Sequence, residues 1–169
     1  LAKGFRQGDR IGIMSVNSAP MIAAYLGIMR AGMVAVPISF KLARETLAYI
    51  VRDAGLQAVF HDHERSSLVP DGLPGIDFDD ASGYAALLDY GPFTAFEPKG
   101  REIATILYTS GSTGMPKGVL LSHESQMWAL DVAARAGDRS HHRYIVAAPM
   151  FHMNATISVK TALHAGASM

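Results

Sequence analysis

The chain has 169 residues, of which 49% are hydrophobic and 18% are charged, a composition typical of a folded globular domain and not of a disordered segment. Its 15 basic residues balance its 15 acidic residues, which argues against the broad positive surface that nucleic-acid binding requires but is compatible with a small local anion site. The lack of cysteine excludes disulfides, thiol nucleophiles and thiolate metal sites, and it fits a reducing compartment such as the cytoplasm.

The first 61 residues alternate apolar, strand-like runs with helical patterns. Ser18 is the expected N-cap of the first helix, Pro20 lies in its first turn, and Gly32 ends it. This part of the chain predicts strands at residues 9–16, 33–38 and 57–61 and helices at 18–32 and 44–53. The βαβαβ order with short connections predicts an α/β fold with a doubly wound, mostly parallel sheet.

Residues 61–99 are richer in proline and aspartate, and we expect a looser region there, with a short strand at 75–78 and a short helix at 84–88. The remaining predicted elements are strands at residues 102–109, 118–122 and 143–148, a helix from Ser122 or Glu124 to about residue 136, and a helix at 154–165. No run of about 18 apolar residues occurs, so no membrane-spanning helix is predicted. Residues 1–6 lack the apolar core of a signal peptide.

Residues 109–118, TSGSTGMPKG, contain four hydroxyl side chains, three glycines, one lysine and no acidic residue. Glycine lets backbone N–H groups approach an anion, hydroxyls add hydrogen-bond donors, and Lys117 adds a positive charge. This composition fits a polyphosphate, and a solvated glycine-serine turn between two strands is the alternative. Pro116 and Gly118, on either side of the lysine, exclude a Walker A loop, and the glycine spacing does not fit the dinucleotide fingerprint G-x-G-x-x-G.

Residues 108–118, YTSGSTGMPKG, resemble the signature loop of the adenylate-forming, or AMP-binding, superfamily. This superfamily includes acyl-CoA synthetases, aryl-CoA ligases, peptide-synthetase adenylation domains and firefly-type luciferases. The resemblance continues in VLLSH at 119–123, in PMFH at 149–152, and in the early helix and AGMVAVP strand between Asn17 and Pro37. These blocks occur in the family's order, and PMFH favours a CoA ligase over a peptide-synthetase domain by analogy.

The resemblance implies that residues 1–169 form an incomplete part of the superfamily's large N-terminal domain, without its small C-terminal domain. It implies attack of a carboxylate on the α-phosphorus of ATP, which gives an acyl-adenylate and pyrophosphate, and then thioester formation with CoA. The implied substrates and cofactors are a carboxylic acid, ATP, Mg²⁺ and CoA, in the cytoplasm, with no nucleic acid or membrane span. A homodimer is left open.

Two blocks receive roles from the resemblance. Lys117 would compensate the charge of the β- and γ-phosphates, and His152 would line the acyl pocket near the substrate carboxylate. His152 is not expected to act as a general base, because a carboxylic acid is already ionised near pH 7. The expected nucleotide-binding residues are Thr109, Ser110, Gly111, Ser112, Thr113, Gly114 and Lys117.

Three polar clusters are interpreted as surface loops, and no metal site is predicted. Residues 61–64, HDHE, could present alternating ligands, but no further ligand set is evident, so a solvated loop is expected. The aspartates of residues 77–80 lack the glycine and terminal glutamate of an EF-hand. His141 and His142 are expected in an exposed turn, and whether Trp128 approaches the substrate pocket is left open.

Later family motifs, including the Y-G-x-T-E segment, the ribose-binding aspartate block and the adenylation lysine, do not occur in the chain. The chain also starts without Met and stops just after Gly166, where a new strand would begin. We therefore expect a piece of a larger enzyme, with little or no activity of its own. The alternatives are a phosphoryl-transfer ATPase or kinase, against which the failed Walker spacing counts, and a non-catalytic module that binds a nucleotide or a partner.

Overall fold

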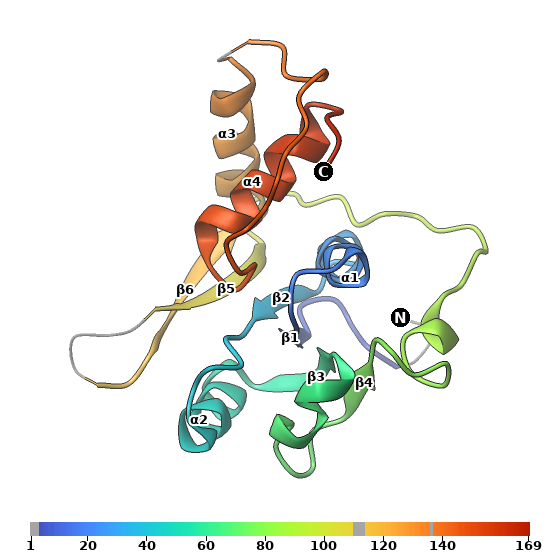
Figure 1. The fold of residues 1–169 in the computed structure, drawn as a ribbon, viewed down its shortest axis with the longest axis vertical. Coiled ribbons are helices and arrows are strands. Elements are labelled where there is room, and N and C mark those ends of the chain that lie inside the picture. Colours follow the sequence, from blue (N-terminus) through green and yellow to red (C-terminus); the bar gives the residue numbers. More distant parts are fainter. Residues whose placement is uncertain (1–3, 110–113, 136) are drawn as a thin grey trace.

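The computed structural model describes residues 4–109, 114–135 and 137–169. Six strands form one sheet in the order β4-β3-β1-β2-β5-β6 (Figure 1). Neighbouring strands run parallel, except β5 and β6, which pair antiparallel. The strands are β1 (Arg10–Met14), β2 (Val34–Pro37), β3 (Leu56–His61), β4 (Gly75–Asp77), β5 (Ile103–Thr109) and β6 (Lys117–Ser122).

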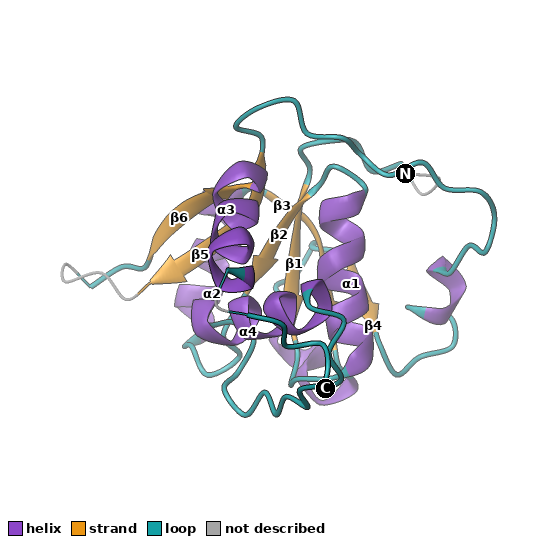
Figure 2. Cartoon of the chain, turned by 90° about the horizontal axis from the view of Figure 1, so that it is seen from above, coloured by secondary structure: helices purple, strands orange, loops and turns teal. Residues whose placement is uncertain are grey.

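Helices lie on both faces of the sheet (Figures 1 and 2). The α-helices are α1 (Ala19–Arg30), α2 (Arg44–Ala54), α3 (His123–Ala134) and α4 (Met153–His164), and two short 3₁₀ helices span His63–Leu68 and Ala85–Leu87. The second 3₁₀ helix replaces the short helix predicted at residues 84–88. None of the described helices is long and apolar enough to cross a membrane.

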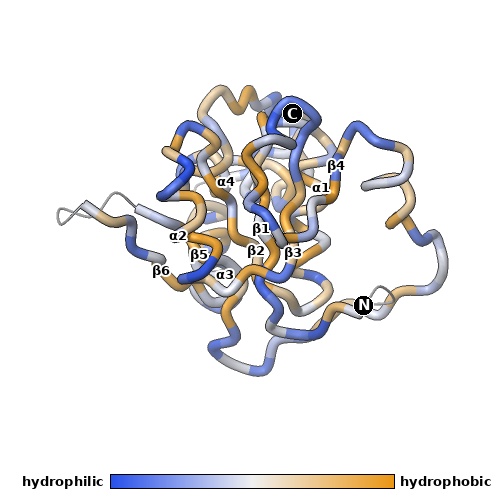
Figure 3. Tube along the Cα trace, turned by 90° about the horizontal axis from the view of Figure 1, so that it is seen from below, coloured by the Kyte–Doolittle hydropathy of each residue, from blue (hydrophilic) through white to orange (hydrophobic). Residues whose placement is uncertain are grey.

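Two apolar cores cover opposite faces of the sheet. On one face, Ile11 and Ile13 of β1 pack with α1 and α4, and on the other face, Val34 and Val36 of β2 pack with α2. Successive strand residues point to opposite faces, so a parallel sheet covered on both sides buries both sets. Figure 3 shows hydrophobic residues concentrated in the central strands and hydrophilic residues mainly in the outer loops.

The order of the strands confirms the predicted doubly wound topology. Helix α1 connects β1 to β2, and α2 then leads back past β1 to β3 on its other side. Because parallel crossovers are almost always right-handed, this reversal of direction places the two helices on opposite faces.

The polar residues at the helix ends explain where the helices start and stop. The Ser18 hydroxyl accepts a hydrogen bond from the Met21 N–H at 3.2 Å, as expected for the N-cap of α1. Ser122 caps α3 in the same way, with the Ser125 N–H at 3.1 Å. Gly55 ends α2 with φ 63°, a left-handed conformation that a residue with a Cβ adopts only with strain.

The prediction of a strand at residues 143–148 is wrong. The described residues contain only an isolated bridge there, between Arg143 and Ser168, and Ile145 is 92% exposed. A strand needs a neighbouring strand to satisfy its backbone N–H and C=O groups. Hydrogen bonds from the Asn17 side chain, not a strand ladder, hold this segment in place.

Candidate functional site

The hairpin of β5 and β6 carries the residues expected to bind phosphate. Its last paired residues are Thr109 and Lys117, which lie directly opposite each other. Gly114 has φ +96°, a left-handed conformation that glycine adopts without strain. The other expected residues, Ser110, Gly111, Ser112 and Thr113, lie outside the described residues.

Thr109 and Lys117 share one face of the hairpin, because directly opposed residues of antiparallel strands point to the same side. In the neighbouring pair, Tyr108 and Gly118, the tyrosine side chain lies on the other side of the hairpin, which faces α2. Lys117 is exposed, whereas Pro116 beside it is buried. The root of the loop therefore presents an exposed ammonium group next to a threonine hydroxyl.

The carboxyl ends of three parallel strands bring this root and the PMFH segment to one edge of the sheet. Strands β1, β2 and β5 are consecutive parallel neighbours, so the segments that follow them emerge at the same edge. Asn17 follows β1, Phe40 follows β2, and Thr109 ends β5. In doubly wound sheets, ligands bind outside the carboxyl ends of the strands where the connection reverses direction. This edge is the candidate site.

The PMFH segment presents His152 at the start of α4. The residue is exposed and has the extended backbone of an N-cap, with φ −103° and ψ 142°. Its N–H donates to the Pro149 carbonyl at 3.0 Å, and its carbonyl accepts from the Ala155 N–H at 3.2 Å. Phe151 is buried, with its ring edge-on to Phe40 at a centroid distance of 5.6 Å. The imidazole therefore lies at a helix N-terminus, where the helix dipole favours an anion.

Asn17 holds the PMFH segment in place, a role that the sequence analysis did not assign. Its Nδ2 donates to the carbonyls of Val146 at 3.1 Å and Ala148 at 2.8 Å, and its Oδ1 accepts from the Met150 N–H at 2.9 Å. One amide thus satisfies three backbone groups of a segment that has no strand partner. An asparagine directly after a buried strand is the signal that could have drawn attention to it.

Replacing Asn17 with alanine is expected to lower the free energy of unfolding by about 1–3 kcal/mol, because backbone groups of the segment lose their partner. In the full-length protein, the KM for the carboxylic acid should rise as well, since His152 loses its fixed position. Thermal unfolding and initial-rate kinetics measure the two effects. An unchanged acid KM beside a clear loss of stability would contradict the link to His152.

The prediction of a solvated loop at residues 61–64 is wrong for His61 and Asp62, which are 6% and 8% exposed. Asp62 accepts from the Val16 N–H at 2.9 Å and from Nη1 of Arg65 at 3.2 Å. His61 Nδ1 lies 3.0 Å from the Asp62 carbonyl oxygen. The carboxylate anchors the chain leaving β1 to the chain leaving β3, so both residues have a structural role at the carboxyl edge.

Within the described residues, no three His, Asp or Glu side chains form a cluster that could hold a metal ion. His63 Nδ1 lies 3.0 Å from Asp77 Oδ2, and this hydrogen bond raises the pKa of His63. Asp79 accepts from the backbone N–H of His63 at 2.9 Å, and Asp80 accepts from the Ser82 hydroxyl at 2.6 Å. These carboxylates stabilise the conformation of their own loop.

A buried lysine is the second residue that the sequence analysis missed. Lys160 of α4 is only 9% exposed, and its Nζ donates to Gln126 Oε1 and, at 3.4 Å, to the Tyr25 hydroxyl. The Tyr25 hydroxyl lies 2.9 Å from Thr105 Oγ1. Among the described residues, no carboxylate forms an ion pair with Lys160. Burial lowers the pKa of Lys160 to about 8.

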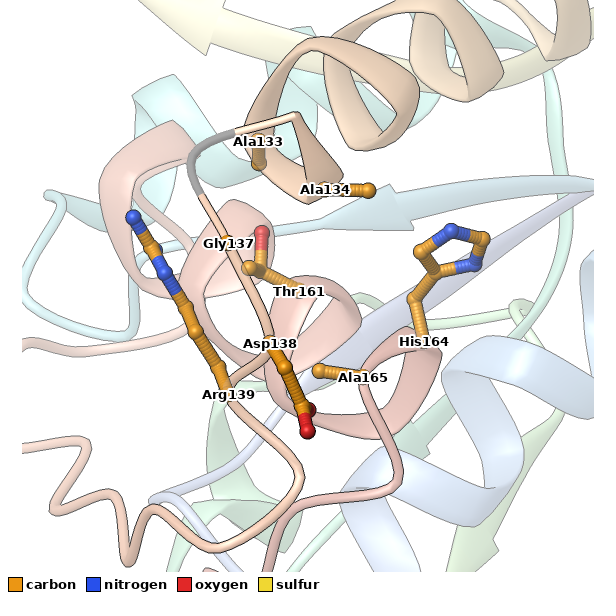
Figure 4. A pocket seen from close by; sticks show the side chains of 8 residues that line it. All are labelled: Ala133, Ala134, Gly137, Asp138, Arg139, Thr161, His164 and Ala165. Atoms are coloured by element: carbon orange, nitrogen blue, oxygen red, sulfur yellow. The ribbon is translucent and has the colours of Figure 1, made fainter.

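Among the described residues, α4 lines three cavities, one of which, of about 340 Å³, also borders α1. The other two lie against α3 and its C-terminal end. One, of about 250 Å³, lies between α3 and α4 and is lined by Trp128, Met153 and Lys160 among others. Trp128 is 68% exposed, so it lies at the rim of this cavity. The second, of about 210 Å³, lies where α3 and α4 end, and Figure 4 shows Asp138 and His164 among its lining side chains.

The second cavity is separate from the carboxyl edge of the sheet. His164 ends α4 and His152 precedes its first residue, so the 12-residue helix, about 18 Å long, separates them. His141 and His142, in the preceding segment, are exposed as predicted.

Several curated proteins with similar sequences are CoA ligases, and peptide synthetases such as gramicidin S synthase 2 of Brevibacillus brevis, 30% identical over 123 residues that cover 73% of this chain and 3% of that protein, also match. The long-chain-fatty-acid–CoA ligase FadD13 of Mycobacterium tuberculosis is 32% identical over 173 residues, which cover 94% of this chain and 33% of that protein. Feruloyl-CoA synthase of Amycolatopsis sp is 31% identical over 153 residues, which cover 89% of this chain and 31% of that protein. The chain spans about a third of the length of these two curated CoA ligases.

Solved structures agree with this relationship. The inhibitor-bound N-terminal domain of FACL13 from Mycobacterium tuberculosis has a TM-score of 0.85 and 29% identity, covering 99% of this chain and 46% of that chain. ATP-bound MatB from Rhodopseudomonas palustris has a TM-score of 0.83 and 27% identity, covering 99% of this chain and 36% of that chain. The family profile for AMP-binding enzymes matches residues 1–169. The chain therefore belongs to the AMP-binding enzyme family.

Proposed function

We propose that the full-length protein activates a carboxylic acid with ATP to an acyl-adenylate and then transfers the acyl group to CoA. The chain would be part of the N-terminal domain of this ligase. The observation that carries the proposal is the root of the β5–β6 loop. Thr109 and the exposed Lys117 lie paired there, at the carboxyl edge of a doubly wound sheet. The names of the relatives support it, since they are a fatty-acid CoA ligase and a feruloyl-CoA synthase.

Lys117 and the loop hydroxyls would act on the triphosphate. The substrate carboxylate attacks the α-phosphorus, the bond to the bridging oxygen of the β-phosphate breaks, and pyrophosphate leaves with the electron pair. Negative charge grows on the departing group, and an ammonium group and hydroxyl donors held in position stabilise that charge. The residues proposed for this contact are Thr109, Ser110, Gly111, Ser112, Thr113, Gly114 and Lys117.

His152 would face the acid. Its imidazole lies beside the first turn of α4, so the ring and the helix N-terminus together favour a carboxylate. A hydrogen bond from the ring would orient the carboxylate without removing a proton, because the acid is already ionised near pH 7. The described residues offer no carboxylate cluster that fits Mg²⁺. The metal would come with ATP and be held by residues beyond this chain.

The proposal is tested by acid-dependent exchange of labelled pyrophosphate into ATP, measured on the full-length protein with a panel of aliphatic and aromatic acids. We expect exchange with at least one acid, AMP as the nucleotide product when CoA is added, and no ADP. Formation of ADP would favour a phosphoryl-transfer enzyme. Nucleotide binding without any turnover would favour a non-catalytic module.

The 169-residue chain by itself is expected to give little or no exchange, because the family's adenine- and ribose-binding motifs and its adenylation lysine do not occur in it. The same exchange assay measures this. Exchange at a rate near that of the full-length protein would refute the assignment of the chain to an incomplete domain.

A further inference from the structure

One hydrogen bond connects the base of the phosphate loop to the helix on the other face of the sheet. The Tyr108 hydroxyl donates to Asp53 Oδ2 at 2.6 Å, although the two residues are 55 positions apart in the sequence. Asp53 lies in the last turn of α2, and its other oxygen accepts from the Tyr49 hydroxyl at 3.3 Å. Both tyrosines therefore converge on one carboxylate.

The ring of Tyr108 lies across the partner strand. Tyr108 and Gly118 are directly opposed in the ladder, and a Cβ at Gly118 would lie 3.3 Å from Tyr108 Cζ and 3.0 Å from Ile106 Cγ2. Such contacts are tighter than ordinary van der Waals distances, so a methyl group here would force Ile106 and the Tyr108 ring to shift by a few tenths of an ångström. Glycine at this position lets the tyrosine ring cover β6 and reach Asp53.

Apart from the β5–β6 ladder and the buried residues Leu107 and Pro116, the outer half of the hairpin is largely exposed. Strand β6 is the edge of the sheet, and its first four residues, 117–120, are exposed. In Figure 1 strands β5 and β6 extend away from the central strands of the sheet. Within the described part of the hairpin, the bond from Tyr108 is the side-chain hydrogen bond that ties residues 107–119 to another element. Tyr108 directly precedes Thr109, the last paired residue.

The Tyr108 hydroxyl keeps its role as hydrogen-bond donor across physiological pH. Burial, together with the hydrogen bond to Asp53, raises the pKa of Tyr108. The hydroxyl therefore stays protonated and donates, and a carboxylate is a strong acceptor for it.

We propose that Asp53 and Tyr108 form a clamp that sets the position of Thr109 and Lys117 for ATP, so that both are positioning residues of the adenylation step. The clamp rests on the proposed function. It acts on the opposite face of the sheet from the phosphates, and neither residue contacts substrate. Its loss should weaken the interaction with ATP and pyrophosphate and leave the acid site unchanged.

The test compares Tyr108→Phe and Asp53→Ala in the full-length protein by acid-dependent pyrophosphate exchange. Each variant should raise the KM for ATP and the inhibition constant of pyrophosphate about tenfold, the effect of losing one hydrogen bond to a charged group. The KM for the acid should stay within about twofold of wild type. The double variant should show no more than the larger single effect, because the two residues act through one bond.

Tyr49→Phe is the matched control, because it removes the other hydrogen bond to the same carboxylate without touching the hairpin. It should leave the KM for ATP unchanged. Gly118→Ala crowds Ile106 and the Tyr108 ring without removing either group of the hydrogen bond, so it should raise the KM for ATP less than Tyr108→Phe does.

Several outcomes would overturn the clamp. One is an unchanged KM for ATP in an active Tyr108→Phe variant. Another is an equal rise in the KM for ATP and acid together with a lower melting temperature, which would indicate a merely structural role. Additive effects in the double variant would exclude a shared bond. A wild-type protein without acid-dependent exchange would instead contradict the proposed function, and the clamp with it, so the two failures are distinguishable.

Discussion

Replacing Lys117 with alanine in the full-length protein is expected to lower kcat/KM for ATP about 100-fold in acid-dependent pyrophosphate exchange, the usual effect of removing one group that stabilises transition-state charge. Lys117 is exposed at the root of the loop and paired with Thr109, so its ammonium group is accessible to a ligand. The alanine variant keeps the backbone ladder of β6 and removes only the charge and its methylene chain. The KM for the acid should change less than about twofold.

Two further variants sharpen this expectation. Lys117→Arg should recover part of the rate, because the charge is retained while the shape of the donor group differs. Lys99→Ala removes another exposed lysine, one that lies before β5 and away from the loop, and should have no effect. An alanine variant with normal ATP kinetics would show that Lys117 does not contact the phosphates.

Replacing Lys160 with methionine is expected to raise the stability of the protein below about pH 8 and to flatten its pH dependence above that value. Burial lowers the pKa of Lys160 from 10.5 to about 8, so the charged form is unfavourable in the folded state. A pKa shift of one unit corresponds to about 1.4 kcal/mol, so burying the charged form of Lys160 costs the native state roughly 3 kcal/mol at neutral pH. The methionine variant avoids this cost but loses the hydrogen bonds to Gln126 and Tyr25. The expected net increase in the free energy of unfolding is therefore about 1–2 kcal/mol.

The sign of the pH effect follows from proton binding. Between about pH 8 and 10.5 the unfolded chain still holds the Lys160 proton while the native protein has lost it. The free energy of unfolding therefore gains a contribution that increases with pH across this window. Below about pH 8 both states are protonated, and the cost of burying the charge is fully present.

Thermal unfolding of wild type and Lys160→Met is measured from pH 6.5 to 10.5. The extra stability of the variant over wild type should shrink as the pH rises. Two titratable groups near Lys160, namely Tyr25 and His123, could also contribute to the pH dependence. Burial raises the pKa of Tyr25 to about 12, outside the window, and burial together with the charge of Lys160 lowers the pKa of His123. In the variant, the pKa of His123 should therefore rise, which an NMR titration can follow. A stability difference that does not change with pH would contradict a charged Lys160.

The architecture of the sheet could be predicted from the sequence because the patterns that specify its strands and helices are local. Buried strands, capped helices and terminating glycines alternate at short range, and Ser18, Ser122 and Gly55 fulfil the roles expected of caps and stops. The strand predicted at residues 143–148 failed for a different reason. Its apolar residues fit a strand, but strand formation depends on a neighbouring edge that local sequence does not reveal.

The sequence predicted only part of the candidate site. The loop composition and the PMFH block were visible as motifs, and the structure brings their elements to one edge of the sheet. Asn17, Lys160 and the pair Asp53–Tyr108 were not assigned roles, because their partners lie 34 to 135 residues away in the sequence. No periodic pattern encodes such contacts.

The sequence by itself determined the α/β class, the family and the order of the elements apart from the strand predicted at residues 143–148, and it predicted which loop binds phosphate. Each of these depends on spacing within a short window or on a contiguous motif. Only the tertiary structure decided which polar side chains are buried and paired. Asp62 is an anchor at the carboxyl edge, Lys160 is a buried cation, and Tyr108 is bonded to α2. The physical reason is that burial and hydrogen-bond partnership are properties of residues that meet only when the chain has folded.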